Sequence, residues 1–178
     1  GSERPAAGPA PAPTDHAGLA FLLHVVAELD LVRELLAGDP GGRLPARPLR
    51  WTLHALARRL APVEPADPAA LLFCGLGPDA EPPSVAAEPP DEDEARRLEE
   101  LAGRIRERLR ERLDDPRPAS EVVAEVTARS GTVVADPGWI EVRLPLSGIS
   151  VPVRRAGLDL DPGWIPWLGV VVKVTYHA

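Results

Sequence analysis

The chain has no methionine, a single lysine (Lys173), a single cysteine (Cys74) and few aromatic residues among its 178 positions. The lone cysteine lies in an apolar run and cannot form an internal disulfide, so a reducing compartment fits. The missing methionine and a Gly1-Ser2 start that resembles a tag-removal scar predict a piece excised from a longer protein. The closing stretch VVVKVTYHA is typical of a terminal strand, so we expect a C-terminal domain.

Long apolar runs and an excess of positive charge are also missing. No run approaches the roughly 20 apolar residues of a membrane-spanning helix, and no signal peptide is recognisable. The net charge is −7, whereas sequence-independent binding of nucleic acid requires a basic surface. We therefore expect neither a membrane span nor a nucleic-acid partner.

The sequence also lacks the common motifs of catalysis. It contains no GxSxG, no GK[ST] phosphate loop and no GxGxxG after a strand. Its four histidines have neither the mutual spacing nor the companion carboxylates of a metal site. Cys74 with His54 as its base is a conceivable nucleophile pair, but a small buried thiol is far more common. We predict a protein that is not an enzyme and uses no cofactor or metal.

Proline, with 22 residues, marks the parts of the chain that do not fold into a core. Residues 1–14 form a Pro/Ala-rich stretch typical of a semi-rigid linker. Residues 15–178 are expected to form a single domain. Within that domain, residues 77–92 are rich in proline and glutamate and predict a loop.

Helical spacing of apolar residues, with capping residues before and Gly or Pro after, predicts five helices. Asp or Thr precedes the first, and Asp67-Pro68 opens the third, because an aspartate oxygen accepts free amide hydrogens and proline fits the first turn. The predicted helices span residues 16–37, 49–61, 69–74, 93–113 and 120–129.

The helix over residues 93–113 has a long apolar stripe that includes Leu98, Leu101, Ile105 and Leu109. Such a stripe packs either on the domain's own helices or on a partner helix, and both possibilities stay open at this point. Glutamate and arginine fill the other faces at spacings that favour ion pairs, which predicts a salt-bridged, solvated face.

The pattern changes in the last third of the chain. Residues 132–135, 140–146 and 170–176 are rich in β-branched residues and predict strands, one of which alternates apolar and polar positions. Residues 149–158 are ambiguous, although Pro152 argues against a long helix there. We expect an α+β fold, mostly helical, closed by a small C-terminal antiparallel sheet.

The pentapeptide DPGWI occurs twice, at residues 136–140 and 161–165. It is an internal repeat, a paired binding site, or two turns that each end in a buried tryptophan. Asp-Pro-Gly is turn chemistry, because proline presets the backbone and glycine accepts a positive φ. The sequences that follow the two copies differ, so we predict two turns that feed neighbouring strands, each with a tryptophan anchor.

Five motifs in order resemble the contractile injection system tape-measure protein family. The first is similar to that family's AGLxLLxPFL helix, and the last to its closing LPWMxxLxVEW. Departures, such as the end in Tyr176-His177-Ala178 instead of tryptophan, indicate a divergent branch or a related accessory protein. The motifs are HAGLAFLLHVVAELDLV (16–32), LRWTLHALARRLA (49–61), AALLFCGLGPD (69–79), GTVVADPGWIEV (131–142) and DPGWIPWLGVVVKVTY (161–176).

The resemblance implies a structural, non-catalytic role in a phage-tail-like particle, as the docking or assembly end of a tape-measure-like protein. Its expected partners are tube, baseplate or other particle proteins, and self-association is left open. The expected location is the cytoplasm during assembly and then the assembled particle. Trp139, Trp164 and Trp167 would hold the terminal sheet together or contact such a partner. A generic protein-binding adaptor module and an enzyme of unknown class are the alternatives.

Overall fold

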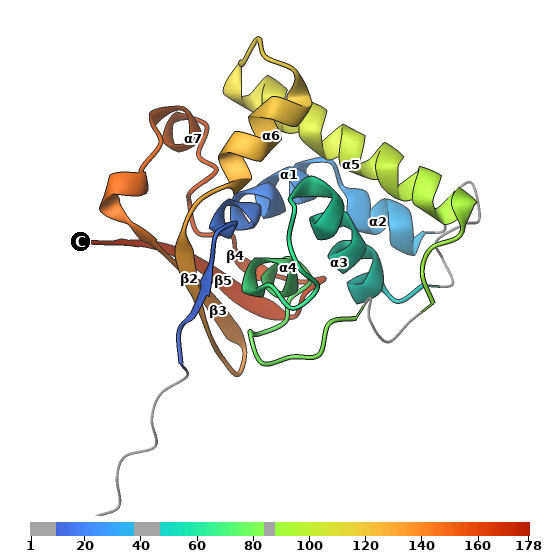
Figure 1. Ribbon diagram of the computed structural model, residues 1–178, viewed down its shortest axis with the longest axis horizontal. Helices are drawn as coiled ribbons and strands as arrows, with labels where there is room; N and C mark the ends of the chain where they lie inside the picture. Colours follow the sequence, from blue (N-terminus) through green and yellow to red (C-terminus); the bar gives the residue numbers. More distant parts are fainter. Residues whose placement is uncertain (1–9, 38–46, 84–87) are drawn as a thin grey trace, which may run out of the picture.

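The computed structural model describes residues 10–37, 47–83 and 88–178. Within them, helices pack on one side of a five-stranded sheet that comes mainly from the C-terminal third (Figure 1), which confirms the predicted α+β class. The elements are β1 (Ala12–Thr14), η1 (Ala17–Phe21), α1 (Leu22–Glu28), α2 (Leu31–Leu36), α3 (Leu49–Leu60), α4 (Pro68–Phe73), α5 (Glu92–Leu113), α6 (Ala119–Thr127), β2 (Gly131–Asp136), β3 (Trp139–Pro145), η2 (Leu146–Gly148), α7 (Val151–Arg155), β4 (Gly163–Ile165) and β5 (Val170–His177).

The predicted first helix is broken into three pieces. A 3₁₀ turn, η1, leads into α1, and α2 begins only after Asp30, whose φ of 56° lies in the left-handed region. Aspartate tolerates this conformation better than most residues, and no glycine or proline announces the break. The prediction of one continuous helix over residues 16–37 was therefore wrong, although most of its apolar positions are buried.

The other predicted helices, α3 to α6, are confirmed with small shifts of their ends, and side chains cap the starts of α4 and α5. Asp67 Oδ1 accepts a hydrogen bond from Ala69 N at 2.9 Å at the start of α4. At the start of α5, Asp91 Oδ1 accepts from Glu94 N at 2.7 Å and Glu94 Oε1 accepts from Asp91 N at 3.3 Å. This reciprocal capping box satisfies two amide hydrogens that the helix leaves free.

The sheet has the strand order β1-β2-β3-β5-β4, and β3 pairs with β5 in parallel. The prediction of an antiparallel sheet was therefore wrong for this pair, whereas the other three pairings are antiparallel. The connection through η2, α7 and β4 returns the chain to the level of the first residue of β3, so β5 runs in the same direction as β3. Strand direction depends on that crossover and not on the residues of either strand.

The short strand β1 lies in the stretch predicted as linker, so the prediction that residues 1–14 are all linker was wrong at its end. Ala12–Thr14 pairs with β2, and Thr14 is buried. The Thr14 hydroxyl donates to Asp67 Oδ1 at 2.7 Å and accepts from His16 N at 3.1 Å. Pro13 is tolerated because β1 is an edge strand, where a missing N–H costs no ladder bond.

Removal of β1 should destabilise the domain. A variant lacking residues 1–14 exposes the edge of β2 and loses the Thr14–Asp67 hydrogen bond, so its free energy of unfolding should fall by about 1–3 kcal/mol. Urea unfolding measures this difference. A variant lacking only residues 1–9 keeps β1 and is the matched control. Equal stability of the two variants would show that β1 is a passive part of the linker.

The stripe of α5 belongs to the domain's own core. Leu98, Leu101, Ile105 and Leu109 are each 0% exposed, and α5 packs on α1, α3 and α6. Of the two possibilities that the sequence left open, the structure selects packing on the domain's own helices. The prediction of these four residues as a partner-binding surface was wrong for this fold.

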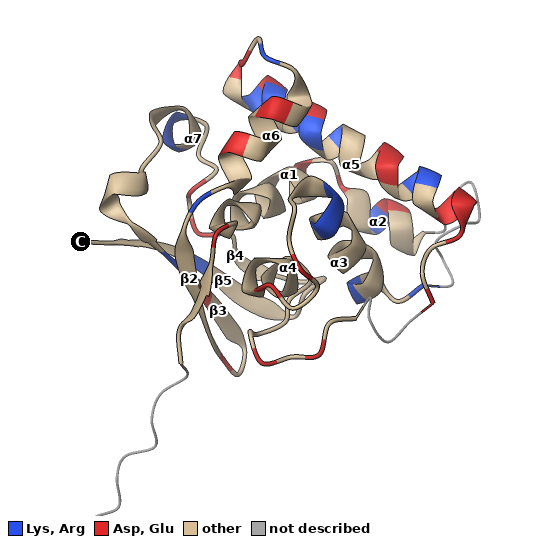
Figure 2. Cartoon of the chain, in the orientation of Figure 1, with Lys and Arg blue, Asp and Glu red and all other residues tan. Residues whose placement is uncertain are grey.

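Basic and acidic residues alternate along α5 (Figure 2), and several of its arginines form ion pairs with glutamates of α1 and α2. Glu34 accepts from Arg97 and from Arg104, each at 3.0 Å. Glu28 is paired with Arg108 at 3.2 Å and with Arg112. These contacts place one carboxylate between two guanidinium groups on each side of the break at Asp30.

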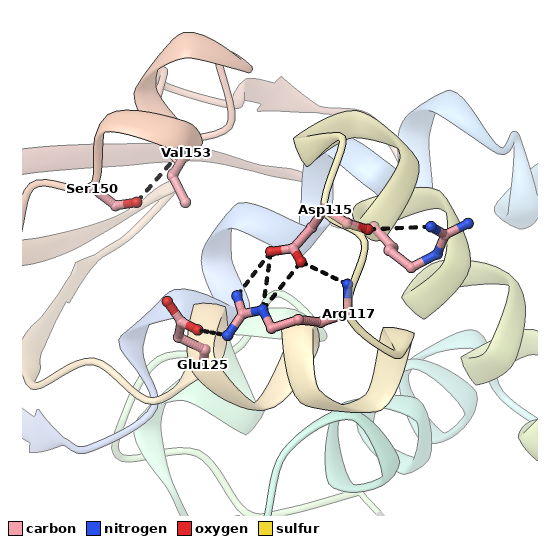
Figure 3. A network of polar contacts seen from close by, with 6 residues as sticks. Asp115, Arg117, Glu125, Ser150 and Val153 are labelled. Carbon is pink, nitrogen blue, oxygen red and sulfur yellow. Dashed lines mark hydrogen bonds and ion pairs between the residues drawn. The ribbon is translucent and has the colours of Figure 1, made fainter.

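The turn between α5 and α6 is organised by a second ionic network (Figure 3). Arg117 Nη2 donates to Asp115 Oδ2 at 2.8 Å, and its other nitrogens reach Asp115 Oδ1 and Glu125. These hydrogen bonds lower the pKa of Asp115 to about 2. In the same view, the Ser150 hydroxyl accepts from Val153 N at 3.4 Å and caps α7. Both sets of contacts stabilise local structure, namely the turn between α5 and α6 and the start of α7.

Candidate protein-binding surface

The two DPGWI copies hold the same strand from opposite sides. In the first copy, Gly138 O accepts from Val171 N at 2.9 Å. In the second copy, Asp161 Oδ1 accepts from Val174 N at 2.8 Å, two residues before β4 begins. Each copy thus extends the hydrogen-bonding of β5, which lies between β3 and β4 in the sheet.

The first copy is a turn, as predicted, whereas the second runs from extended chain into β4 and is not itself a turn. The strands predicted after the two copies, β3 and β5, are direct neighbours in the sheet, as predicted. Pro137 and Gly138 connect β2 to β3, and Gly138 has a φ of 88°. Gly163 has a φ of 71° where the chain enters β4. Glycine accepts both values without the steric cost of a side chain.

The tryptophans of the two copies form one row across the sheet. Trp139 and Trp164 are both in register with Val171, from the parallel and the antiparallel side respectively. Trp139 is half-buried, whereas Trp164 is 61% exposed. The predicted buried anchor is therefore wrong for Trp164.

The helices leave one face of the sheet uncovered (Figure 1), which we call the outer sheet face. The strand register and the burial pattern place the tryptophan row on this face. Along β3 and β5, buried residues alternate with residues that point to this face, as expected for a sheet with one solvated side. We define the outer sheet face by Trp139, Glu141, Arg143, Trp164, Val171, Lys173 and Thr175.

Charged groups border the tryptophan row. The Lys173 ammonium lies 5.7 Å from the centroid of the Trp139 ring. Glu141 Oε1 accepts from Arg143 Nε at 2.6 Å and from Thr175 Oγ1 at 3.1 Å. The Arg143 hydrogen bond holds the pKa of Glu141 below its usual value, so the carboxylate is charged at neutral pH. The face thus combines an exposed apolar row with fixed ion pairs, which suits a protein partner.

Trp167, predicted with the other two, lies elsewhere. It packs against the hydrophobic core and lines an apolar groove of about 570 Å³ together with residues of α1 and α2. The exposed Leu36 and the residue pair Asp30 and Arg33 lie on the opposite wall of this groove. The structure therefore groups Trp139 with Trp164 and separates both from Trp167.

Cys74 and His54, the nucleophile pair that the sequence suggested, are both buried. Cys74 is 0% exposed, its thiol donates to Leu71 O, and burial raises its pKa to about 12. His54 Nε2 contacts Pro65 O at 2.8 Å, and burial lowers the pKa of its imidazole. A thiol with so high a pKa is a poor nucleophile at neutral pH.

In the part of the chain that the structure describes, no group of three or more His, Cys, Asp or Glu side chains is arranged to hold a metal ion. Among the same residues, no helix combines the length and apolar character needed to cross a bilayer.

Comparisons with protein-family models, with curated proteins and with solved structures find no match for this chain.

Sequence analysis missed Val171 and Lys173 as members of the outer sheet face. The period-two alternation of β3 was recognised, and the same alternation in β5 would have placed Val171, Lys173 and Thr175 opposite the buried Val172 and Val174. The alignment of Trp139 with Trp164 could not be found in this way, because it depends on the register of two strands with β5.

Proposed function

We propose that this chain is a non-catalytic assembly domain of a phage-tail-like contractile injection system, at the docking end of a tape-measure-like protein. The outer sheet face would be its docking surface for a tube or baseplate protein. The observation that carries the proposal is Trp164, 61% exposed in a row with Trp139 and Val171. An exposed tryptophan in one row with a second aromatic residue is typical of interface hot spots.

The motif order supports this proposal from the sequence side. Of the two tryptophan elements that resemble the tape-measure family, the Gly-Trp element at Gly138-Trp139 supplies part of the row, whereas the Pro-Trp element at Pro166-Trp167 lies outside it. The segments at Gly138 and Asp161 each accept a hydrogen bond from β5, so both tryptophans are anchored to the same strand. Burial of Cys74 and His54 favours a binding role over catalysis.

A pull-down with this domain as bait, from a lysate of the source organism and read by mass spectrometry, tests the proposal. The wild-type domain should recover tube, baseplate or sheath proteins. Trp164→Ala should lose them while its free energy of unfolding changes by only about 0.5 kcal/mol, because the side chain is mostly solvated. Circular dichroism checks that the variant is folded.

Leu36→Ala is the matched control, because Leu36 is 70% exposed but lies on α2, away from the outer sheet face. It should recover the same particle proteins as the wild type. Recovery of one soluble partner at fixed stoichiometry would favour the adaptor alternative instead. Recovery of no partner, or equal loss with both variants, would contradict docking through this face.

A further inference from the structure

A second surface lies on the helical side of the molecule, along α3. Two adjacent cavities of about 530 and 260 Å³ share Arg58 and Arg59 in their walls. The larger lies between α3, α5 and α6, and the smaller continues toward Trp51 and the segment before α5. We call the two cavities together the α3 groove.

The α3 groove has an excess of positive charge on a chain whose net charge is −7. Arg59 Nη1 and Arg106 Nη1 share one carboxylate, Glu99, at 3.2 and 2.7 Å. The exposed Arg58 makes no hydrogen bond or ion pair with any residue that the structure describes. Three guanidinium groups therefore face a single carboxylate, which leaves the groove able to attract an acidic ligand.

One end of the groove already holds an extended segment of this chain. Pro89 and Pro90 line the smaller cavity together with Trp51. Arg47 donates from Nη1 to Glu88 O at 2.9 Å and from Nη2 to Pro89 O at 3.3 Å. The Arg47 guanidinium also lies 4.2 Å from the centroid of the Trp51 ring. An aromatic ring beside prolines, with donors to their carbonyl oxygens, is how proline-rich peptides are bound.

The larger cavity continues the groove beyond the chain's own Glu-Pro-Pro segment. Its floor includes apolar residues such as Leu60 and Val123, and its rim carries Arg58, Arg59 and Arg106. The charge of this rim complements an acidic segment, and the shared wall at Arg58 and Arg59 gives a continuous path from one cavity to the other.

We infer that the α3 groove binds an extended, proline-containing acidic peptide segment of a partner protein. The contact at Arg58 is electrostatic and therefore weakens with salt, since exposed charge pairs are screened by ions. This surface is separate from the outer sheet face, so the inference stands or falls independently of the proposed function.

Fluorescence anisotropy with a labelled synthetic peptide of Glu-Pro-Pro units tests the inference. The wild-type chain should bind this peptide at low salt and lose it at high salt. A Lys-Pro-Pro peptide should not bind, and a Glu-Ser-Ser peptide of the same charge should bind more weakly. Arg58→Glu should weaken binding about tenfold or more, and Arg58→Ala by a smaller factor in the same direction.

Arg155→Glu is the matched control, because Arg155 is an exposed arginine on α7 and the substitution changes the net charge equally. It should bind the Glu-Pro-Pro peptide like the wild type. Failure of the wild type to bind, or equal weakening by Arg58→Glu and Arg155→Glu, would overturn the inference. Equal binding of the Glu-Ser-Ser peptide would overturn the requirement for proline.

Discussion

Gly18→Ala is expected to lower the free energy of unfolding by about 3 kcal/mol or more, because it forces an atom into a packed site. A Cβ at Gly18 would lie 1.9 Å from Val126 O and 2.8 Å from Thr127 Cα. Both are backbone atoms at the end of α6, so relief requires η1 and α6 to separate. Urea unfolding followed by tryptophan fluorescence measures the effect.

Gly103→Ala is the control for this substitution within the same chain. Gly103 lies inside α5, and a Cβ there would meet nothing within 4 Å. Alanine has a higher helix propensity than glycine, so the free energy of unfolding of this variant should rise by about 1 kcal/mol. If Gly18→Ala were as stable as Gly103→Ala, the close approach of η1 to α6 would be incorrect.

Leu101→Ala is the second substitution with a large expected effect, a loss of about 2–5 kcal/mol. Leu101 is 0% exposed in the hydrophobic core, so the smaller side chain leaves a cavity and loses apolar burial. The same urea titration applies. Glu100→Ala, at a neighbouring exposed position with one ion pair to Arg97, should change stability by no more than about 1 kcal/mol.

The Leu101 result also decides between the two roles that the sequence permits for the α5 stripe. A stripe reserved for a partner helix would be solvated in the free domain. In that case Leu101→Ala would leave the unfolding transition unchanged and would weaken only partner binding. Because the stripe is buried, we expect Leu101→Ala to lower the free energy of unfolding instead.

These two stability tests separate the core from the surfaces proposed for binding. Gly18 and Leu101 are buried, whereas Trp164 and Arg58 are exposed. A loss of partner binding in Trp164→Ala or Arg58→Glu with an unchanged unfolding transition therefore reports on contact with the partner. Each of these two variants also serves as a control for the other surface.

The sequence by itself determined most of the helices and the three long strands. Capping at Asp67 and Asp91, helical spacing in α3 and α5, and β-branched runs in β2, β3 and β5 depend on residues a few positions apart. Such local interactions act in nearly the same way whatever the rest of the chain does. The Asp-Pro-Gly turn between β2 and β3 was predictable for the same reason.

Only the tertiary structure decided how these elements face one another. The parallel pairing of β3 with β5 depends on the crossover through α7, and the recruitment of Ala12–Thr14 depends on the free edge of β2. The exposure of Trp164, the burial of the α5 stripe and the unshared charge of Arg58 likewise depend on partners far away in sequence. Identical DPGWI segments therefore give one half-buried and one exposed tryptophan, because the surroundings of each ring are set by packing and not by the pentapeptide.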